Sequence, residues 1–215
     1  MNWQQIFPAL RQKSRQLLNG LLAPRCLICS CVVTEAGRFC ADYLQKLAFL
    51  TIPHCRRCDI PYEIGGGTLD CLNCLAAPPR FTQARAAVVY DAASRPLVLG
   101  LKRADHTYLA NTLARMMRQA RQPMLADCDG IAPVPLHRRH LFLRCFNQSA
   151  LLAQKIAKTL ALPVWQDMLI RHRSTLPQTS LNANERARNV RDAFAVKPKL
   201  VQTMQVKSSC SLTMC

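Results

Sequence analysis

The sequence predicts an α/β protein in which a cysteine-rich zinc ribbon precedes a domain of alternating strands and helices. Eight of the twelve cysteines fall between Cys26 and Cys74, and six of the eight form Cys-x-x-Cys pairs. After residue 85, short apolar runs alternate with stretches of helical periodicity, which is typical of a mostly parallel sheet. The expected parts are an amphipathic N-terminal helix (1–25), a zinc-ribbon module (26–77), the α/β domain (80–200) and an aberrant tail (201–215).

The chain of 215 residues is strongly basic, with 29 Lys and Arg against 12 Asp and Glu and a net charge of +17. This balance favours polyanionic partners, namely nucleic acid, phosphorylated small molecules or an anionic membrane surface. No apolar run approaches the roughly 18 residues of a membrane span, and no secretory signal precedes the cysteines. We therefore expect a reduced, cytoplasmic protein without a transmembrane segment.

The second half of the cysteine-rich segment has the spacing of a complete zinc site. Cys55 and Cys58 form one Cys-x-x-Cys pair, and Cys71 and Cys74 form another after twelve intervening residues. Two such pairs supply four thiolates to one tetrahedral zinc. The alternative is that these four cysteines form disulfides.

The first half is incomplete. Cys26, Cys29 and Cys40 supply three thiolates, but Tyr43 stands where a second Cys-x-x-Cys pair would close. Cys31 is the only nearby substitute. Whether a first zinc site forms is therefore open from the sequence.

The stretch 131–153 combines an apolar strand, a basic loop and a helix. Arg138, Arg139 and Arg144 follow the strand, and a polar turn at Asn147 and Gln148 precedes a helical pattern. Open α/β sheets bind ligands at the carboxyl ends of their strands, where a helix N-terminus adds partial positive charge. The alternative is a solvated basic loop before an ordinary helix.

The remaining elements follow from periodicity. Two helical stretches are expected, at 97–102 and 109–120, the second of them a core helix. Strands are expected at 86–90, at the apolar run that ends at 170, and at 193–196.

Taken in order, these segments resemble the ComF family of phosphoribosyltransferase-like proteins, which are associated with bacterial competence. The resemblance covers about 26–194 and rests on the paired cysteines, Leu101-Lys102, Val134-Pro-Leu-His, Phe146-Asn-Gln148, Arg171-x-Arg173 and Ala193-Phe194. It implies an N-terminal zinc ribbon followed by a Rossmann-like type I phosphoribosyltransferase domain. The family usually has Gly where Cys145 stands and Cys where Tyr43 stands.

The resemblance also implies ligands. Phosphoribosyl diphosphate needs cations and Mg²⁺ to hold its phosphates. Some of the polar residues are expected to be structural, since a polar residue at a helix start is more often a cap than a ligand. The implied substrate-binding residues are Lys102, Arg138, Arg139, Arg144, Asn147, Gln148, Arg171, Gln178, Arg186 and Asn189. The expected zinc ligands are Cys26, Cys29, Cys40, Cys55, Cys58, Cys71 and Cys74.

The family's Asp-Asp and Thr-Thr-Gly loop, which holds the sugar phosphate and Mg²⁺, is expected after Phe194 and is absent. The tail shows no strand pattern and no acidic residue. By hypothesis, TCN serine codons and a shifted frame over 207–215 give five apolar residues, two from Asp, Asn, His and Tyr, and one apolar residue. With suitable third bases this is Val-Ile-Leu-Leu-Val-Asp-Asp-Val, the missing strand and acidic pair. We therefore expect a truncated or frameshifted copy with an incomplete domain, without Mg²⁺ ligands and without catalysis, which sequencing of the gene tests.

Two functions remain from the sequence. The first is a ComF-like phosphoribosyltransferase-domain protein of competence and DNA uptake, a glycosyltransferase by class but inactive here. It is expected to bind phosphoribosyl diphosphate weakly or not at all and to work with the DNA-uptake machinery. The second is a zinc-ribbon module that binds single-stranded DNA. An aromatic content of 6% leaves few side chains for base stacking in the second case.

Overall fold

The computed structural model describes residues 23–50, 53–62, 70–102, 106–120, 124–125, 128–198 and 210–212. The chain forms two compact units, Met1–Leu47 and Ala48–Cys215. The predicted module 26–77 therefore contributes cysteines to both units. The predicted helix at 1–25 lies almost entirely outside the described residues. Among those that are described, no helix has the length and apolarity needed to cross a membrane.

The first unit is a small ribbon around one helix, α2 (Ala41–Lys46). Residues Arg25 and Val32 form an antiparallel bridge that closes a tight turn. Phe39, Tyr43 and Leu47 are buried, and the Phe39 and Tyr43 ring centroids lie 5.2 Å apart. The described apolar residues form a core too small to stabilise a unit alone, so we infer that the cysteines contribute to its fold.

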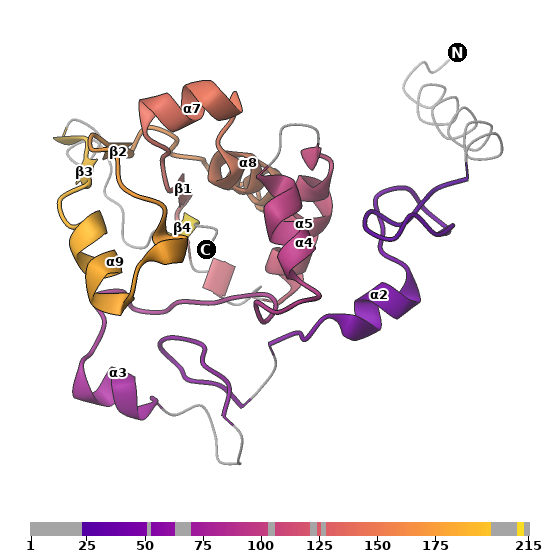
Figure 1. Cartoon of the computed structure of the whole chain (residues 1–215), viewed down its shortest axis with the longest axis horizontal. Coiled ribbons are helices and arrows are strands. Elements are labelled where there is room, and N and C mark those ends of the chain that lie inside the picture. The colour runs from indigo at the N-terminus through magenta and orange to yellow at the C-terminus, as the bar shows by residue number, and fades with distance from the viewer. Residues whose placement is uncertain are drawn as a thin grey trace. The chain divides into compact units, whose positions relative to one another are not determined.

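The second unit contains the remaining described elements, all of them short (Figure 1). Its helices are α3 (Leu72–Ala76), α4 (Arg95–Leu101), α5 (Leu109–Ala120), α7 (Arg138–Arg144), α8 (Gln148–Leu160), the 3₁₀ turn η2 (Gln178–Ser180) and α9 (Ala183–Val190). Its strands are β1 (Ile131–Pro133), β2 (Leu169–Arg171), β3 (Phe194–Val196) and β4 (Cys210–Leu212).

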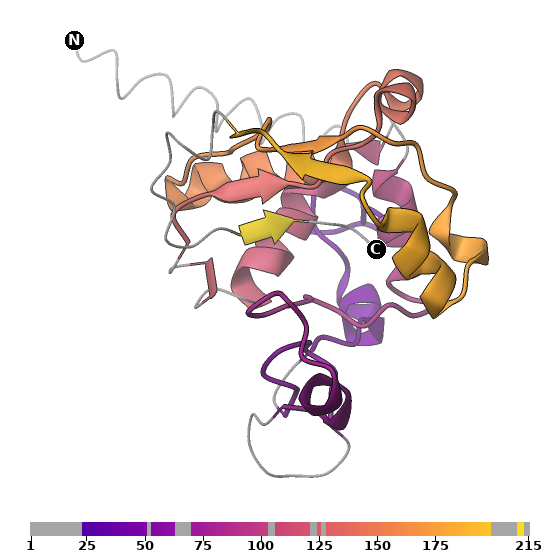
Figure 2. The same ribbon diagram turned by 90° about the vertical axis from the view of Figure 1, so that its left-hand side faces the viewer.

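The core of this unit forms where α8 covers β1. Strands β1 and β4 pair in parallel, and Ile131 also forms a parallel bridge with Val164, so α8 connects two parallel strand segments (Figure 2). All three residues of β1 are buried. Leu152 and Ile156 of α8 are buried against it, and α5 packs on α8. This β-α-β arrangement agrees with the predicted mixture of strands and helices.

The helices that were predicted from periodicity do form. The apolar stripe of 109–120 becomes α5, with Leu109, Ala110, Ala114 and Met116 buried. Segment 97–102 becomes the end of α4, and Lys102 is its C-cap. Gly100 allows α5 to approach α4 closely, because a Cβ at this position would lie 2.8 Å from Cδ1 of Leu109.

Four expectations about the strands and loops are wrong in part. The predicted strand at 86–90 is a single antiparallel bridge between Val88 and Phe49, since only this short stretch finds a partner. The tail, expected to lack a strand, forms β4 beside β1. Strands β2 and β3 pair antiparallel rather than parallel, with Arg171 opposite Phe194. The basic loop after β1 is the helix α7.

Candidate metal centres and cationic cluster

The first cysteine cluster is built on a tight turn. The amide of Cys26 donates to the carbonyl of Cys31 at 2.7 Å, and the amide of Ser30 donates to the carbonyl of Cys26 at 3.1 Å. Ser30 adopts a left-handed conformation with φ of 60°. Cys40 is the N-cap of α2, and its amide donates to Sγ of Cys26 at 3.4 Å. The turn and the helix start thus bring cysteines together from both sides.

The second cluster repeats this construction. The amide of Cys55 donates to the carbonyl of Ile60 at 2.8 Å, and the amide of Asp59 donates to the carbonyl of Cys55 at 3.1 Å. Asp59 has φ of 68°. Cys71 is the N-cap of α3, and its amide donates to Sγ of Cys55 at 3.3 Å. Hydrogen bonds and backbone conformations therefore match position by position between the two clusters.

The match identifies the fourth thiolate of each cluster. Cys74 completes the second cluster from α3, as predicted from the spacing. Tyr43 occupies the equivalent place on α2 and is buried against Phe39. Cys31 completes the first cluster instead, because its Sγ lies 3.3 Å from Sγ of Cys29. The sulfur atoms of Cys26, Cys29, Cys31 and Cys40 lie within 4.8 Å of one another, as do those of Cys55, Cys58, Cys71 and Cys74.

The sequence left the fourth ligand of the first cluster open, and Cys31 is the residue that was missing from the predicted ligand set. The only signal for it was its nearness to Cys29. The turn places Cys31 at the position that Ile60 holds in the second cluster. The extra cysteine thus lies in the turn rather than on the helix.

The chemistry of both clusters fits zinc. Four sulfurs bound to one zinc lie about 3.8 Å apart, given Zn–S bonds of about 2.3 Å. Burial opposes ionisation of Cys55, yet the backbone N–H groups of Cys58, Cys71 and Arg57 lower its pKa to about 6. Burial raises the pKa of Cys74 to about 12, with further contributions from the neighbouring sulfurs. Only a bound cation lets all four thiolates of such a cluster coexist near neutral pH.

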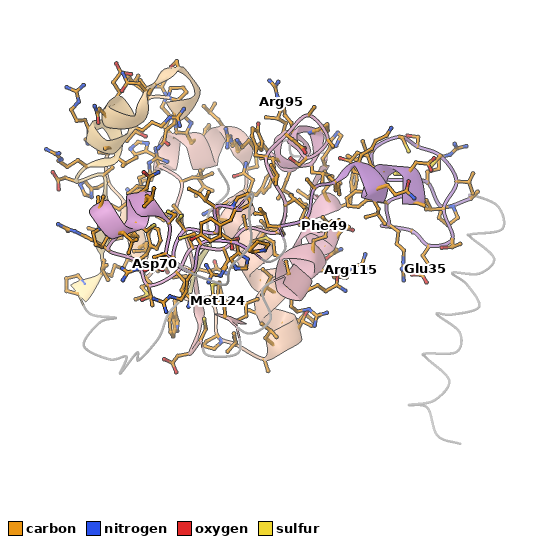
Figure 3. All side chains as sticks on the ribbon, turned by 90° about the horizontal axis from the view of Figure 1, so that it is seen from below. Glu35, Phe49, Asp70, Arg95, Arg115 and Met124 are labelled. Carbon is orange, nitrogen blue, oxygen red and sulfur yellow. The ribbon has the colours of Figure 1, made fainter. Side chains whose placement is uncertain are left out.

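The arginines around the second cluster are paired with acids. Asp70, which is labelled in Figure 3, directly precedes Cys71. Its carboxylate accepts a hydrogen bond from Nε of Arg57 at 2.7 Å and lies 3.4 Å from Nε of Arg56. The hydrogen bond from Arg57 holds the pKa of Asp70 below its usual range. The carboxylate of Asp59 likewise faces Arg85 at 3.9 Å and His54 at 3.4 Å.

Helix α7 carries three of the predicted substrate-binding arginines, Arg138, Arg139 and Arg144. The helix begins at His137, whose side chain accepts from the amide of Arg139, and it buries none of its residues. It ends at Cys145, which adopts φ of 60°. A left-handed C-cap favours glycine, so the conformation explains why Gly is usual at this position.

Two predicted site residues form the start of α8. Asn147 is its N-cap, accepting from the amide of Ser149 at 3.0 Å and donating Nδ2 to the carbonyl of Val134 at 3.0 Å. The expectation that some polar residues are caps is met here. Gln148 is 5% exposed, and its Nε2 has no hydrogen-bond partner among the described residues. A buried amide donor without an acceptor is costly, which makes Gln148 a candidate ligand-binding group.

Arg171 lies on β2 beside α7. Its guanidinium lies 5.5 Å from the centroid of the Phe194 ring and donates to Oγ1 of Thr175, while Nε has no partner among the described residues. Burial lowers the pKa of His140 on α7, and the charges of Arg171 and Arg144 lower it further. Arg171 and Arg144 therefore carry the positive charge near His140, whose own protonation they oppose.

The other predicted substrate residues serve local structure in this arrangement. Asn189 of α9 bonds both backbone groups of Leu176, at 3.1 Å and 3.0 Å. Arg186 donates Nε to the carbonyl of Gln178 at 3.2 Å. Lys102 lies at the end of α4, away from these loops in the sequence. Whether any of them binds substrate stays a prediction.

Comparison with known proteins agrees with the double cluster. A sequence profile described as a double zinc ribbon domain matches residues 17–75. It spans both sets of cysteines, including the first set, whose completeness the sequence left open.

Curated relatives extend over most of the chain. The DNA utilization protein YhgH of Salmonella typhi is 33% identical over 148 residues, which cover 66% of this chain and 64% of the relative. YhgH of Escherichia coli K12 is 30% identical over the same share of each chain. Competence protein F of Haemophilus influenzae is 27% identical over 177 residues, 80% of this chain and 76% of the relative.

The chain thus spans just under two thirds of the length of the YhgH proteins that it matches. No solved structure matches it significantly. The named relatives and the double zinc ribbon agree with the family to which the sequence is similar. The likeness to the YhgH proteins and to competence protein F, together with the double zinc ribbon, supports a ComF-family protein.

Proposed function

We propose that the chain is a cytoplasmic DNA-utilisation protein that binds single-stranded DNA and works with DNA-uptake machinery. The observation that carries this proposal is a surplus of unpaired cations. Segment 130–166 contains five Lys and Arg and no Asp or Glu. Arg138, Arg139, Arg144 and Arg171 have no carboxylate partner among the described residues. The names of the YhgH proteins and competence protein F support a role in DNA handling.

Unpaired cations at a surface favour a polyanion because binding releases its condensed counterions. The zinc ribbons have another role in this proposal, since Arg38, Arg56 and Arg57 are already paired with acids. We infer that the bound zinc stabilises the fold of both units and that the DNA contacts are made by the second unit. The sequence-based alternative, a ribbon that itself binds DNA, becomes an outcome of the test.

Fluorescence anisotropy with a labelled oligothymidylate tests the proposal. We expect an affinity that falls steeply as salt rises, with a slope set by the number of phosphate contacts. The quadruple variant Arg138→Ala/Arg139→Ala/Arg144→Ala/Arg171→Ala loses binding, whereas Arg56→Ala/Arg57→Ala keeps it. The reverse result assigns DNA binding to the ribbon, and no binding by the wild-type chain refutes the proposal.

A second candidate is an anion site of the phosphoribosyltransferase type. It is supported by Gln148, whose buried Nε2 lacks a partner among the described residues, and by Arg171, whose buried Nε also lacks one there. The expected Rossmann-like domain and its phosphoribosyl diphosphate ligand are proposals on this basis. The 215 residues contain no Asp-Asp followed by Thr-Thr-Gly, so they lack the acidic pair that positions Mg²⁺ on the ribose.

Isothermal titration separates the candidates. We expect phosphoribosyl diphosphate with Mg²⁺ to bind weakly or not at all, and no transfer of the phosphoribosyl group by these residues. Micromolar binding that is lost in Gln148→Leu, with single-stranded DNA binding unchanged, makes the anion site an independent second function.

A further inference from the structure

The outward face of α7, defined as Arg138, Arg139, Phe142 and Leu143, has no partner within the described residues. Residues four apart lie on the same side of a helix, so Arg138 lies beside Phe142 and Arg139 beside Leu143. Phe142 is 84% exposed and Leu143 is 69% exposed. Figure 1 shows α7 at the upper edge of its unit.

The opposite side of the helix has a different environment. His140 and Arg144 are half-buried, and Arg171 is near enough to lower the pKa of His140. The predicted phosphate-binding arginines are thereby divided. Arg144 lies on the same side of α7 as His140, while Arg138 and Arg139 lie on the same side as Phe142.

The charges of the outward face are uncompensated, in contrast to those of the ribbons. Arg38 pairs with Glu35 at 2.7 Å, and Arg57 pairs with Asp70 at 2.7 Å. Arg138 and Arg139 form no ion pair with the described carboxylates, and the nearest acids along the chain are Asp129 and Asp167. An exposed aromatic ring next to unpaired arginines is chemically complementary to a base and its flanking phosphates.

We propose that the outward face of α7 binds single-stranded nucleic acid, with Phe142 stacking on a base and Arg138 and Arg139 contacting the adjacent phosphates. The inference rests on the proposed DNA binding and assigns its contact surface. Single strands fit better than duplex, because the base faces of a duplex are already stacked. A membrane surface also attracts cations and apolar groups, but a helix of seven residues buries little in it.

The experiment measures anisotropy of a fluorescent oligothymidylate of about 20 nucleotides, long enough for one site, with the full-length chain. Phe142→Ala is expected to raise Kd about tenfold, the effect of losing one stacked base. Phe142→Trp retains binding, and the fluorescence of the new tryptophan is quenched by the oligonucleotide. Phe142→Leu behaves as Phe142→Ala, because it keeps the apolar volume but not the aromatic face.

The arginines are tested by salt dependence. Arg138→Ala/Arg139→Ala is expected to reduce the slope of log K against log salt by about 1.4, since each single-strand phosphate contact contributes about 0.7. Matched controls are Arg95→Ala, which removes an exposed charge from α4, and Phe81→Ala, which removes an exposed aromatic ring. Both leave binding unchanged, and thermal melting checks that every variant is folded.

The outcomes separate the two proposals. If the wild-type chain binds the oligonucleotide and the α7 variants bind equally well, the contact surface is elsewhere and this inference is wrong, while the proposed function stands. If the wild-type chain does not bind, both fail. Phosphatidylglycerol vesicles are the third arm: vesicle binding that survives in Phe142→Leu, without oligonucleotide binding, makes the face a membrane contact and overturns the inference.

Discussion

The turn around Cys26 and the turn around Cys55 have the same backbone hydrogen bonds, and each has a left-handed residue at the same position. Their fourth thiolates nevertheless come from different parts of the chain. In the second ribbon the ligand is Cys74 on α3, which is buried. In the first ribbon it is Cys31 in the turn itself, which is exposed. A tetrahedral site constrains where the sulfurs meet and leaves open which part of the chain supplies them.

The difference has a consequence for stability. The second cluster lies within the larger unit, and its arginines are held by Asp70 and Asp59. The first cluster lies in a unit with a small apolar core and has two exposed cysteines, Cys29 and Cys31. We infer that the second zinc supports the fold of the larger unit and that the first supports only its own ribbon.

The largest effect is expected from Cys55→Ser. It removes a buried ligand from the second cluster, so the protein should lose one zinc and the larger unit should be destabilised by about 4 kcal/mol or more. Zinc content by mass spectrometry and chemical unfolding measure the two effects. Cys145→Ser, which removes an exposed thiol outside both clusters, should change neither. A variant that retains both zincs excludes Cys55 as a ligand.

A more local effect is expected from Cys31→Ser. It should lose one zinc while the unfolding of the larger unit stays unchanged. The double variant Cys31→Ser/Tyr43→Cys gives the first ribbon the ligand pattern of the second and should regain the zinc. Its stability should recover only in part, because the Tyr43 ring no longer packs on Phe39. Full zinc content in Cys31→Ser alone contradicts the assignment of Cys31.

A smaller effect is expected on the rates at which the two clusters release zinc. In a chelator chase, the zinc bound by exposed Cys29 and Cys31 should leave about tenfold faster than the zinc held by buried Cys55 and Cys74, since solvent access and outer contacts control metal release. A colorimetric zinc indicator should report two phases in the wild-type chain and one in Cys31→Ser. A single phase in the wild type argues against the difference in protection.

The sequence predicted the parts of this comparison that depend on spacing. Two Cys-x-x-Cys pairs predict the second cluster because the distance between ligands is fixed by a turn of constant geometry. Some of the polar site residues were expected to be helix caps, and Asn147 is one, since short polar side chains satisfy free amides at helix starts. These features are local, so the neighbouring residues in the sequence determine their structure.

Other features depend on partners that are distant in the sequence or on helical phase. Cys31 becomes a ligand only because the turn directs its sulfur toward Cys29. The segment 138–144 was expected to be a loop, since it has no buried stripe. Because it forms a helix, Arg138 and Arg144 lie on different sides of it. Strand β4 forms because β1 offers it an edge, which no pattern in the tail indicates.

The smallest effects, and the sharpest comparison, concern the left-handed residues Ser30 and Asp59. Ser30→Gly should stabilise the first ribbon by about 1 kcal/mol, because glycine adopts positive φ without steric cost. Asp59→Gly should instead destabilise the second ribbon. The carboxylate that it removes accepts from the amide of Ala86 at 2.8 Å and faces His54 and Arg85. Chemical unfolding of the zinc-loaded protein measures both changes in stability. If the two substitutions shift stability in the same direction, the Asp59 contacts contribute less than the conformation of the turn.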